Sequence, residues 1–155
     1  MGTHSLIRMR VNGVTWFGLY QQYDGYPEMV GVELAEWLCG LTVVNGISTG
    51  DSSRRIANGP HCLFKQLVGY YYNKSNVGGS YLYPSDQADG FEEWNYDVDY
   101  DTDTDEITLS IYDHERRVKN GTPEAMLEWC RTQDKKQKET GELVTDDDSS
   151  DQEEK

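Results

Sequence analysis

The chain lacks any hydrophobic run near the ~20 residues that a membrane helix needs, and it shows no secretory signal pattern. Its three cysteines, Cys39, Cys62 and Cys130, stand far apart, and none forms a Cys-x-x-Cys pair. A zinc site or a disulfide framework therefore has little support, since both need cysteines at close or regular spacing. We expect a cytoplasmic protein in a reducing compartment, with no membrane association, bound metal or cofactor.

Cationic residues are also few, with 14 Lys and Arg against 28 Asp and Glu and a formal net charge of −14. Residues 1–92 hold six Lys/Arg and eight Asp/Glu, whereas residues 93–155 hold eight and twenty. Direct nucleic-acid binding is not expected, because a phosphate-backbone binder needs clustered cations. The composition predicts one domain over residues 1–133, followed by an acidic disordered tail over 134–155 that has almost nothing apolar to bury.

What the sequence does contain is a set of strand and helix patterns. Asn12-Gly13 stands between two β-rich runs, which indicates a hairpin because both central turn positions need positive φ. Gly40 follows an amphipathic helix pattern, where we expect the left-handed conformation. The patterns predict helices over 30–41, 60–71 and 122–133 and strands over 5–10, 14–20, 42–44, 80–83, 94–100 and 107–112. We therefore predict an α+β fold, with a mainly antiparallel sheet of four or five strands and two or three helices packed on one face.

The stretch Gln21–Pro27 is an unusually aromatic connection between a hairpin and a helix. Two tyrosines, a carboxylate, a glycine and a proline are more than a connection needs. Tyrosines offer flat contact area with a polar tip at low entropic cost, and binding residues concentrate on loops held by a scaffold. We predict that Tyr23, Asp24 and Tyr26 anchor a partner, with Gly25 in a conformation closed to other residues.

A second part of the predicted binding surface precedes the second helix. Arg54 and Arg55 follow a polar connection, and Asn58 and Gly59 stand just before Pro60, which opens the helix. Exposed N–H groups at a helix start bind anions, so these residues predict an anion site beside the aromatic loop. The segment is not a P-loop, since Gly-x-x-x-x-Gly-Lys-Ser/Thr is absent. The expected partner is a protein or a small anionic ligand, and the oligomeric state stays open.

Candidate catalytic groups lie close to both parts of this surface. Cys62 stands with His61 at the predicted helix start, where N–H groups and the macrodipole stabilise a thiolate. Adjacent helical residues point about 100° apart, so His61 is poorly placed as the base for Cys62. Another histidine, His4 or His114, would have to serve, and the alternative is a buried cysteine beside an exposed histidine. Asp24 is a further candidate, as a general base.

An alternating run of five aspartates, from Asp97 to Asp105, resembles a calcium loop at first sight. An EF-hand loop needs glycine at its sixth position and glutamate at its twelfth, and neither register of this run supplies them. We expect Asp97 and Asp99 on the solvent face of a strand and the other three in its turn.

Three segments carry a resemblance: Met1-Gly2-Thr3-His4-Ser5-Leu6, Gln21–Pro27 and Ala57–Leu63. Together they resemble a family of small uncharacterised phage and prokaryotic proteins that open Met-Gly-Thr-Arg-Ser-Leu and carry a Tyr-Asp-Gly-Tyr-Pro loop. The resemblance covers residues 1–112. His4 stands where the family has arginine, so no role of that arginine carries over. No activity is attached to the family, so the resemblance implies a fold and leaves the function open.

The sequence is compatible with three functions. We expect a non-enzymatic binding protein, such as a phage or viral accessory protein inside a host cell, that uses the aromatic loop. The first alternative is a small hydrolase or transferase that uses Cys62 or Asp24. The second is an acidic nucleic-acid mimic, which needs carboxylates fixed in a folded array.

Overall fold

The computed structural model describes residues 2–44, 46, 55–74, 79–90 and 92–140, with side chains described up to residue 133 of the last helix. The strands are β1 (Ser5–Val11), β2 (Val14–Gln21), β3 (Leu41–Val44), β4 (Arg55–Asn58), β5 (Ser80–Pro84), β6 (Trp94–Asp101), β7 (Glu106–Asp113) and β8 (Arg116–Gly121). The helical segments are η1 (Pro27–Gly31), α1 (Val32–Cys39), α2 (Gly59–Lys74), η2 (Ser85–Gln87) and α3 (Pro123–Thr140).

The main sheet has six strands in the order β5-β2-β1-β6-β7-β8, and β3 and β4 form a separate parallel pair. Within the main sheet β1 and β6 are parallel, and the other pairs are antiparallel. The predicted α+β class is confirmed, but the sheet is mixed and is larger than the four or five strands predicted. Strand β8 was not predicted because its sequence, Arg-Arg-Val-Lys-Asn-Gly, has one apolar residue and so no alternation of apolar and polar residues.

The first hairpin forms where the sequence predicts it. Asn12 and Gly13 take φ values of 51° and 83°, the left-handed geometry that a tight turn between two strands requires. The hairpin register sets Ile7 opposite Leu19 and Met9 opposite Phe17. Ile7 and Met9 are fully buried, so this face of β1 forms part of the core.

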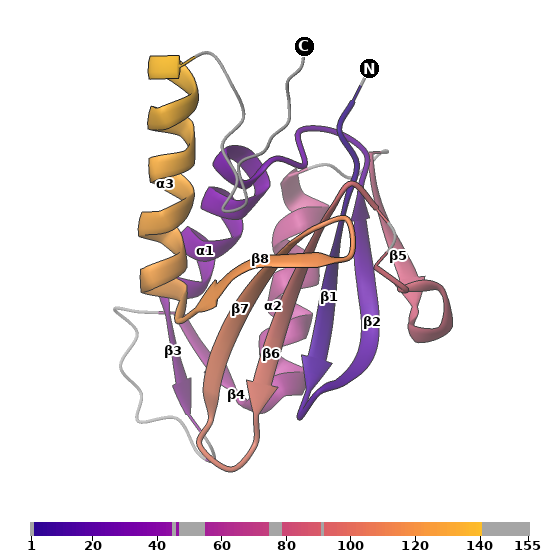
Figure 1. Ribbon diagram of the computed structural model, residues 1–155. Helices are drawn as coiled ribbons and strands as arrows, with labels where there is room; N and C mark the ends of the chain where they lie inside the picture. The colour runs from indigo at the N-terminus through magenta and orange to yellow at the C-terminus, as the bar shows by residue number, and fades with distance from the viewer. Residues whose placement is uncertain (1, 45, 47–54, 75–78, 91, 141–155) are drawn as a thin grey trace.

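The helices build a layer against the sheet. Figure 1 shows α1 and α2 behind the strands, with α3 beside them, and α3 contacts α1, η1 and β8. A single core joins the sheet to all three helices. Its largest fully buried side chains are Tyr71, Tyr96, Tyr100 and Phe64. No helix within the described ranges is long and apolar enough to cross a membrane.

The helix ends differ from the prediction in two places. Gly40 takes φ −82° and ψ 1°, so the predicted left-handed end of α1 is wrong; its N–H donates instead to the carbonyl of Trp37 at 3.2 Å. Thr122 caps α3 as predicted, accepting a hydrogen bond from the N–H of Ala125 at 3.2 Å. The helix continues to Thr140, past the predicted end at residue 133, and residues 141–155 of the predicted tail lie outside the described residues.

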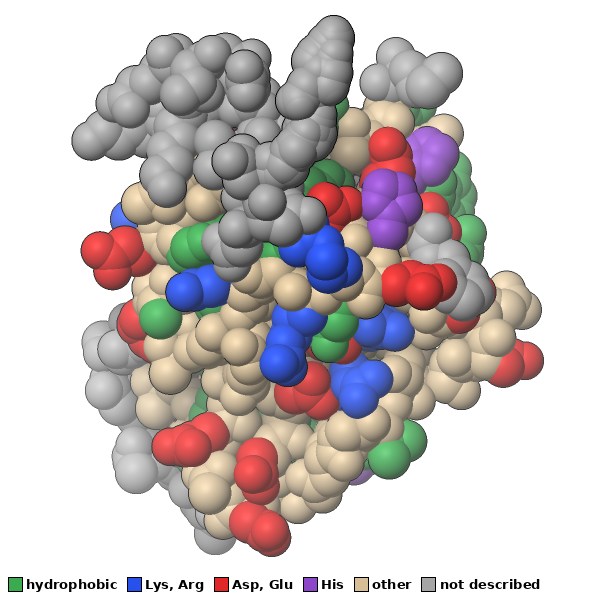
Figure 2. All heavy atoms as spheres, in the orientation of Figure 1, with side chains coloured by type: hydrophobic (Ala, Val, Ile, Leu, Met, Phe, Trp, Pro, Cys, Tyr) green, Lys and Arg blue, Asp and Glu red, His purple; other side chains and the backbone are tan. Residues whose placement is uncertain are grey.

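The opposite face of the sheet carries paired charges, and Figure 2 shows cationic and anionic side chains together over its middle. The parallel register of β1 and β6 sets Arg8 beside Asp97. Arg8 donates to both carboxylate oxygens of Asp97, at 2.5 and 2.9 Å, and its guanidinium lies 5.6 Å from the ring centre of Tyr112. The prediction that Asp97 faces solvent is therefore wrong: it is only 2% exposed, and burial raises its pKa despite Arg8.

Candidate functional site

The aromatic loop is held by its backbone against the start of β1. The N–H of Gly25 donates to the carbonyl of Thr3 at 2.9 Å, and the hydroxyl of Tyr96 donates to the carbonyl of Gly25 at 2.6 Å. A Cβ on Gly25 would lie 2.8 Å from the Cβ of Ser5, so the glycine is required by close approach. The left-handed residue of the loop is Asp24, with φ 58°. The special backbone conformation predicted for Gly25 is therefore wrong, and the glycine is needed for close approach instead.

The helical turn that follows the loop is wider than an α-helix. Pro27–Gly31 form the π-helical segment η1, in which the N–H of Gly31 reaches back to the carbonyl of Tyr26 at 3.4 Å. Such segments are rare and often stand at functional sites. In this protein η1 leads directly into α1 and brings Met29 and Val30 to the wall of a pocket.

That pocket has a volume of about 460 Å³, within the range of ligand-binding clefts. Four elements meet at it: the end of β2 with the aromatic loop, η1 with α1, the last turns of α2, and the start of β5. Its described lining residues are Gln21, Tyr23, Asp24, Glu28, Met29, Val30, Val32, Glu33, Glu36, Tyr70, Tyr71, Lys74, Gly79 and Ser80.

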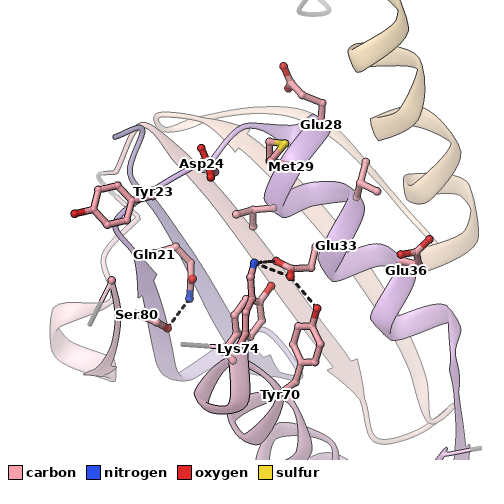
Figure 3. Close-up of a pocket in the computed structure, with 14 residues that line it drawn as sticks. Gln21, Tyr23, Asp24, Glu28, Met29, Glu33, Glu36, Tyr70, Lys74 and Ser80 are labelled. Carbon is pink, nitrogen blue, oxygen red and sulfur yellow. Dashed lines mark hydrogen bonds and ion pairs between the residues drawn. The ribbon is translucent and has the colours of Figure 1, made fainter. Parts of the chain in front are cut away.

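Glu33 is the centre of the polar contacts in the pocket (Figure 3). The ammonium of Lys74 donates to one of its oxygens at 2.8 Å and lies 2.7 Å from the other, and the hydroxyl of Tyr70 donates to it at 2.8 Å. Burial and the hydrogen bond to Glu33 raise the pKa of Tyr70 to about 12. At neutral pH this hydroxyl is therefore a permanent donor that orients the carboxylate.

Two further polar side chains of the lining are almost wholly buried. Tyr71 is 2% exposed, and its hydroxyl has no hydrogen-bond partner within the described part of the chain. Burial and the nearby Glu33 raise its pKa well above the ordinary value, so the phenol stays neutral. Gln21 is 8% exposed, and its amide donates to the hydroxyl of Ser80 at 2.9 Å. A buried hydroxyl left without a partner costs free energy, so the Tyr71 hydroxyl differs from most buried polar groups, which are hydrogen-bonded.

Two exposed side chains at the rim of the pocket are aromatic or apolar. Tyr23 is 58% exposed and Met29 is 50% exposed, and Figure 3 shows the Tyr23 hydroxyl pointing outward from the pocket. Of the predicted anchors, Tyr23 and Asp24 line the pocket, whereas Tyr26 does not belong to the lining and is half-buried. Exposed tyrosine and methionine at the edge of a polar pocket are typical of recognition surfaces.

The predicted anion site lies at the other end of α2. The pocket meets the last turns of this helix, from Tyr70 to Lys74, whereas Asn58 and Gly59 stand at its start, about 17 to 23 Å away along the helix axis. Arg55 donates to the carbonyl of Trp37 at 2.5 Å and lies over its ring at 4.3 Å, and the Asn58 side chain bonds the backbone of Gly46. Arg54 lies outside the described residues. The loop and this segment therefore do not form one surface.

Cys62 lies in the first turn of α2, as predicted. A backbone hydrogen bond from Asn58 and the amide of Gln66, 3.3 Å from the sulfur, lower the pKa of its thiol against the effect of burial. No histidine base is positioned beside it: the His61 ring packs on Trp16, with 4.7 Å between ring centres. The two other histidines are engaged elsewhere, His4 with Tyr20 and His114 with Asp113.

Glu33, Tyr70, Tyr71 and Lys74 were not among the predicted site residues. Tyr70 and Lys74 are four residues apart on α2 and so share a helix face, which is the signal that the sequence offered. Their partner Glu33 comes from another helix, and this link has no sequence signature. Among the described residues no group of three or more His, Cys, Asp or Glu side chains is arranged to hold a metal ion. Comparison of the chain with protein-family models, with curated proteins and with solved structures finds no match.

Proposed function

We propose that the chain is a non-enzymatic binding protein that captures a protein partner through the pocket beneath the aromatic loop. The observation that carries this proposal is the combination of an exposed rim, Tyr23 and Met29, with a recessed carboxylate, Glu33, that Tyr70 and Lys74 hold in place inside the same pocket. Rigid aromatic groups around a recessed polar group are a common form of recognition site. The resemblance to phage and prokaryotic proteins is the reason to propose an accessory role inside a host cell.

Tyr23→Ala tests the rim, with Tyr72→Ala as a matched control. Tyr72 is 60% exposed on α2 and is not part of the pocket lining, so both changes remove an exposed tyrosine. Proteins captured from native lysate are identified by mass spectrometry, purified, and titrated against each variant. We expect Tyr23→Ala to weaken binding at least tenfold, which is about 1.4 kcal/mol, with an unchanged melting temperature. Equal losses in both variants, or none in either, would refute the proposal.

A small hydrolase or transferase remains the second candidate, because the lowered pKa of the Cys62 thiol is a property of reactive cysteines. The same titration separates the two functions. Under the binding proposal Cys62→Ser leaves capture unchanged, since Cys62 does not line the pocket. An acidic nucleic-acid mimic has less support, because Asp97 and Asp99 are paired with Arg8 and Arg10 and so do not form an unneutralised acidic array.

A further inference from the structure

We propose that the pocket recognises an aliphatic cation, the ammonium or guanidinium end of a lysine or arginine side chain of the partner, and that Lys74 fills the place of this cation when the partner is absent. This inference rests on the proposed function, because it names the chemical group that the pocket receives. It replaces the small anionic ligand that the sequence predicted with a ligand of opposite charge.

The first support is that the pocket already holds an ammonium group. Lys74 contacts both oxygens of Glu33, at 2.7 and 2.8 Å, and its nitrogen lies 6.0 Å from the ring centre of Tyr71. Tyr70 donates to the same carboxylate and fixes its direction. A carboxylate held in place beside aromatic faces is the arrangement that proteins use to bind cations.

The second support is the hydroxyl of Tyr71. It is buried in the pocket lining and has no hydrogen-bond partner among the described residues. A neutral phenol oxygen has lone pairs that accept hydrogen bonds, and an ammonium has three N–H donors. Lys74 contacts Glu33 and leaves this hydroxyl unpartnered. The oxygen is closed to solvent in this state, so a ligand cation reaches it only by displacing Lys74 and moving side chains of the lining.

The third support is the balance of charge. The described lining holds the carboxylates Asp24, Glu28, Glu33 and Glu36 and the ammonium of Lys74, and Glu36 is paired with Arg131 at 3.0 Å from outside the lining. An anion would have to approach Asp24 and Glu33, whereas a cation is attracted to both. Figure 3 shows Asp24 on the loop and Glu33 on α1, so carboxylates from two different elements line the pocket.

Lys74 is suited to leave its place without disturbing the fold. Its side chain is 52% exposed, and it belongs to the last residue of α2. A long, flexible side chain at a helix end can turn into solvent while the helix remains intact. An incoming cation thus competes with Lys74 for Glu33, and the apparent affinity is lowered by the fraction of molecules in which Lys74 occupies the site.

The test is a titration followed by backbone amide NMR, with N-acetyl-lysine methylamide as a peptide-like cation and putrescine as a free diamine. Acetate and inorganic phosphate serve as anionic probes. In the wild-type chain we expect both cations to shift the amide signals around Glu33 and Tyr70–Lys74, and the anions to leave them unchanged. Tighter binding of the peptide-like probe points to a protein side chain as the source, whereas tighter binding of putrescine overturns the protein source.

Three variants make the test specific. Lys74→Met removes the internal competitor, so it should tighten cation binding by about threefold to tenfold, and Glu33→Gln should abolish binding. Tyr71→Phe should weaken binding without lowering the melting temperature, because the hydroxyl it removes has no partner in the fold. Lys65→Met is the matched control, since Lys65 is an exposed lysine of the same helix outside the lining, and it should change nothing.

Weaker cation binding by Lys74→Met, or binding of acetate or phosphate, would overturn the inference in favour of an anion site. The inference also falls if neither cation shifts the signals of either the wild type or Lys74→Met. In that case partner capture that still depends on Tyr23 leaves the proposed function standing, so the two failures are distinguishable.

Discussion

Three consecutive tyrosines on α2 show how far one residue type can differ in role. Tyr70 is half-buried and orients Glu33, Tyr71 is buried between the core and the pocket, and Tyr72 is exposed. Successive helical residues point about 100° apart, so three neighbours reach three environments. Helical spacing alone places at least one of three consecutive rings near the surface, but it does not show which one lies beside a pocket.

Cys62 and Cys130 should differ in reactivity, because their surroundings shift the pKa values of their thiols in opposite directions. The pKa of the Cys62 thiol is lowered by hydrogen bonds from Asn58 and Gln66, whereas burial and Glu28 raise the pKa of Cys130 to about 12. Iodoacetamide at neutral pH should therefore alkylate Cys62 and leave Cys130 intact in the folded protein, as read by peptide mass spectrometry. Gln66→Leu should move the alkylation midpoint of Cys62 to higher pH. Equal rates at Cys62 and Cys130 would contradict these environments.

At the scale of elements, the neighbouring strands β1 and β6 share a buried ion pair. Arg8→Met should cost about 3 kcal/mol of unfolding free energy, because it leaves the Asp97 carboxylate buried with only Arg10 nearby, at 3.8 Å. Arg8→Met combined with Asp97→Leu should recover most of the loss, since neither charge then remains buried. Urea unfolding measures both variants. The control is Arg131→Met, whose exposed pair with Glu36 should cost about 1 kcal/mol or less. An equal loss in both single variants would show that burial of the ion pair does not matter.

Elements with a local signal could be predicted, and elements that depend on distant partners could not. Two residues are enough to predict a turn or a helix start in two places. Asn12-Gly13 predicts the first hairpin, and Thr122-Pro123 predicts the start of α3. The burial of Asp97 depends instead on Arg8, 89 positions earlier in the chain, and the pocket depends on Glu33 meeting the far end of α2. Such pairings depend on how the whole fold packs. The hydrophobic periodicity of a single segment does not predict them.

At the scale of the whole molecule, buried tyrosines predict a sensitivity to alkaline pH. Burial raises the pKa values of Tyr71 and Tyr96 well above the ordinary value, and Tyr70 reaches about 12. In the unfolded chain these phenols lose their protons near pH ~10. The folded state therefore binds protons that the unfolded state releases, so this contribution to stability is intact below about pH 10 and is lost as the pH rises toward the folded pKa values.

We accordingly expect the melting temperature to fall steadily above pH ~10, with the tyrosinate absorbance appearing together with unfolding. Tyr71→Phe removes one such proton and deletes a hydroxyl that has no partner in the fold, so its alkaline midpoint should lie at higher pH. A midpoint identical to that of the wild type would show that Tyr71 does not contribute.

The parallel pairing of β1 with β6 also decides when the molecule can be completed during its synthesis. The strand at the N-terminal end finds its first neighbour, β2, as soon as the hairpin leaves the ribosome, but its second neighbour begins only at Trp94. Until then one edge of β1 keeps its backbone groups unpaired, and Ile7 and Met9 lack Tyr96 and Val98 beside them. If translation pauses before β6 is made, the unpaired edge of β1 is exposed and can pair with strands of other nascent chains. Chaperones can bind this edge during the same interval.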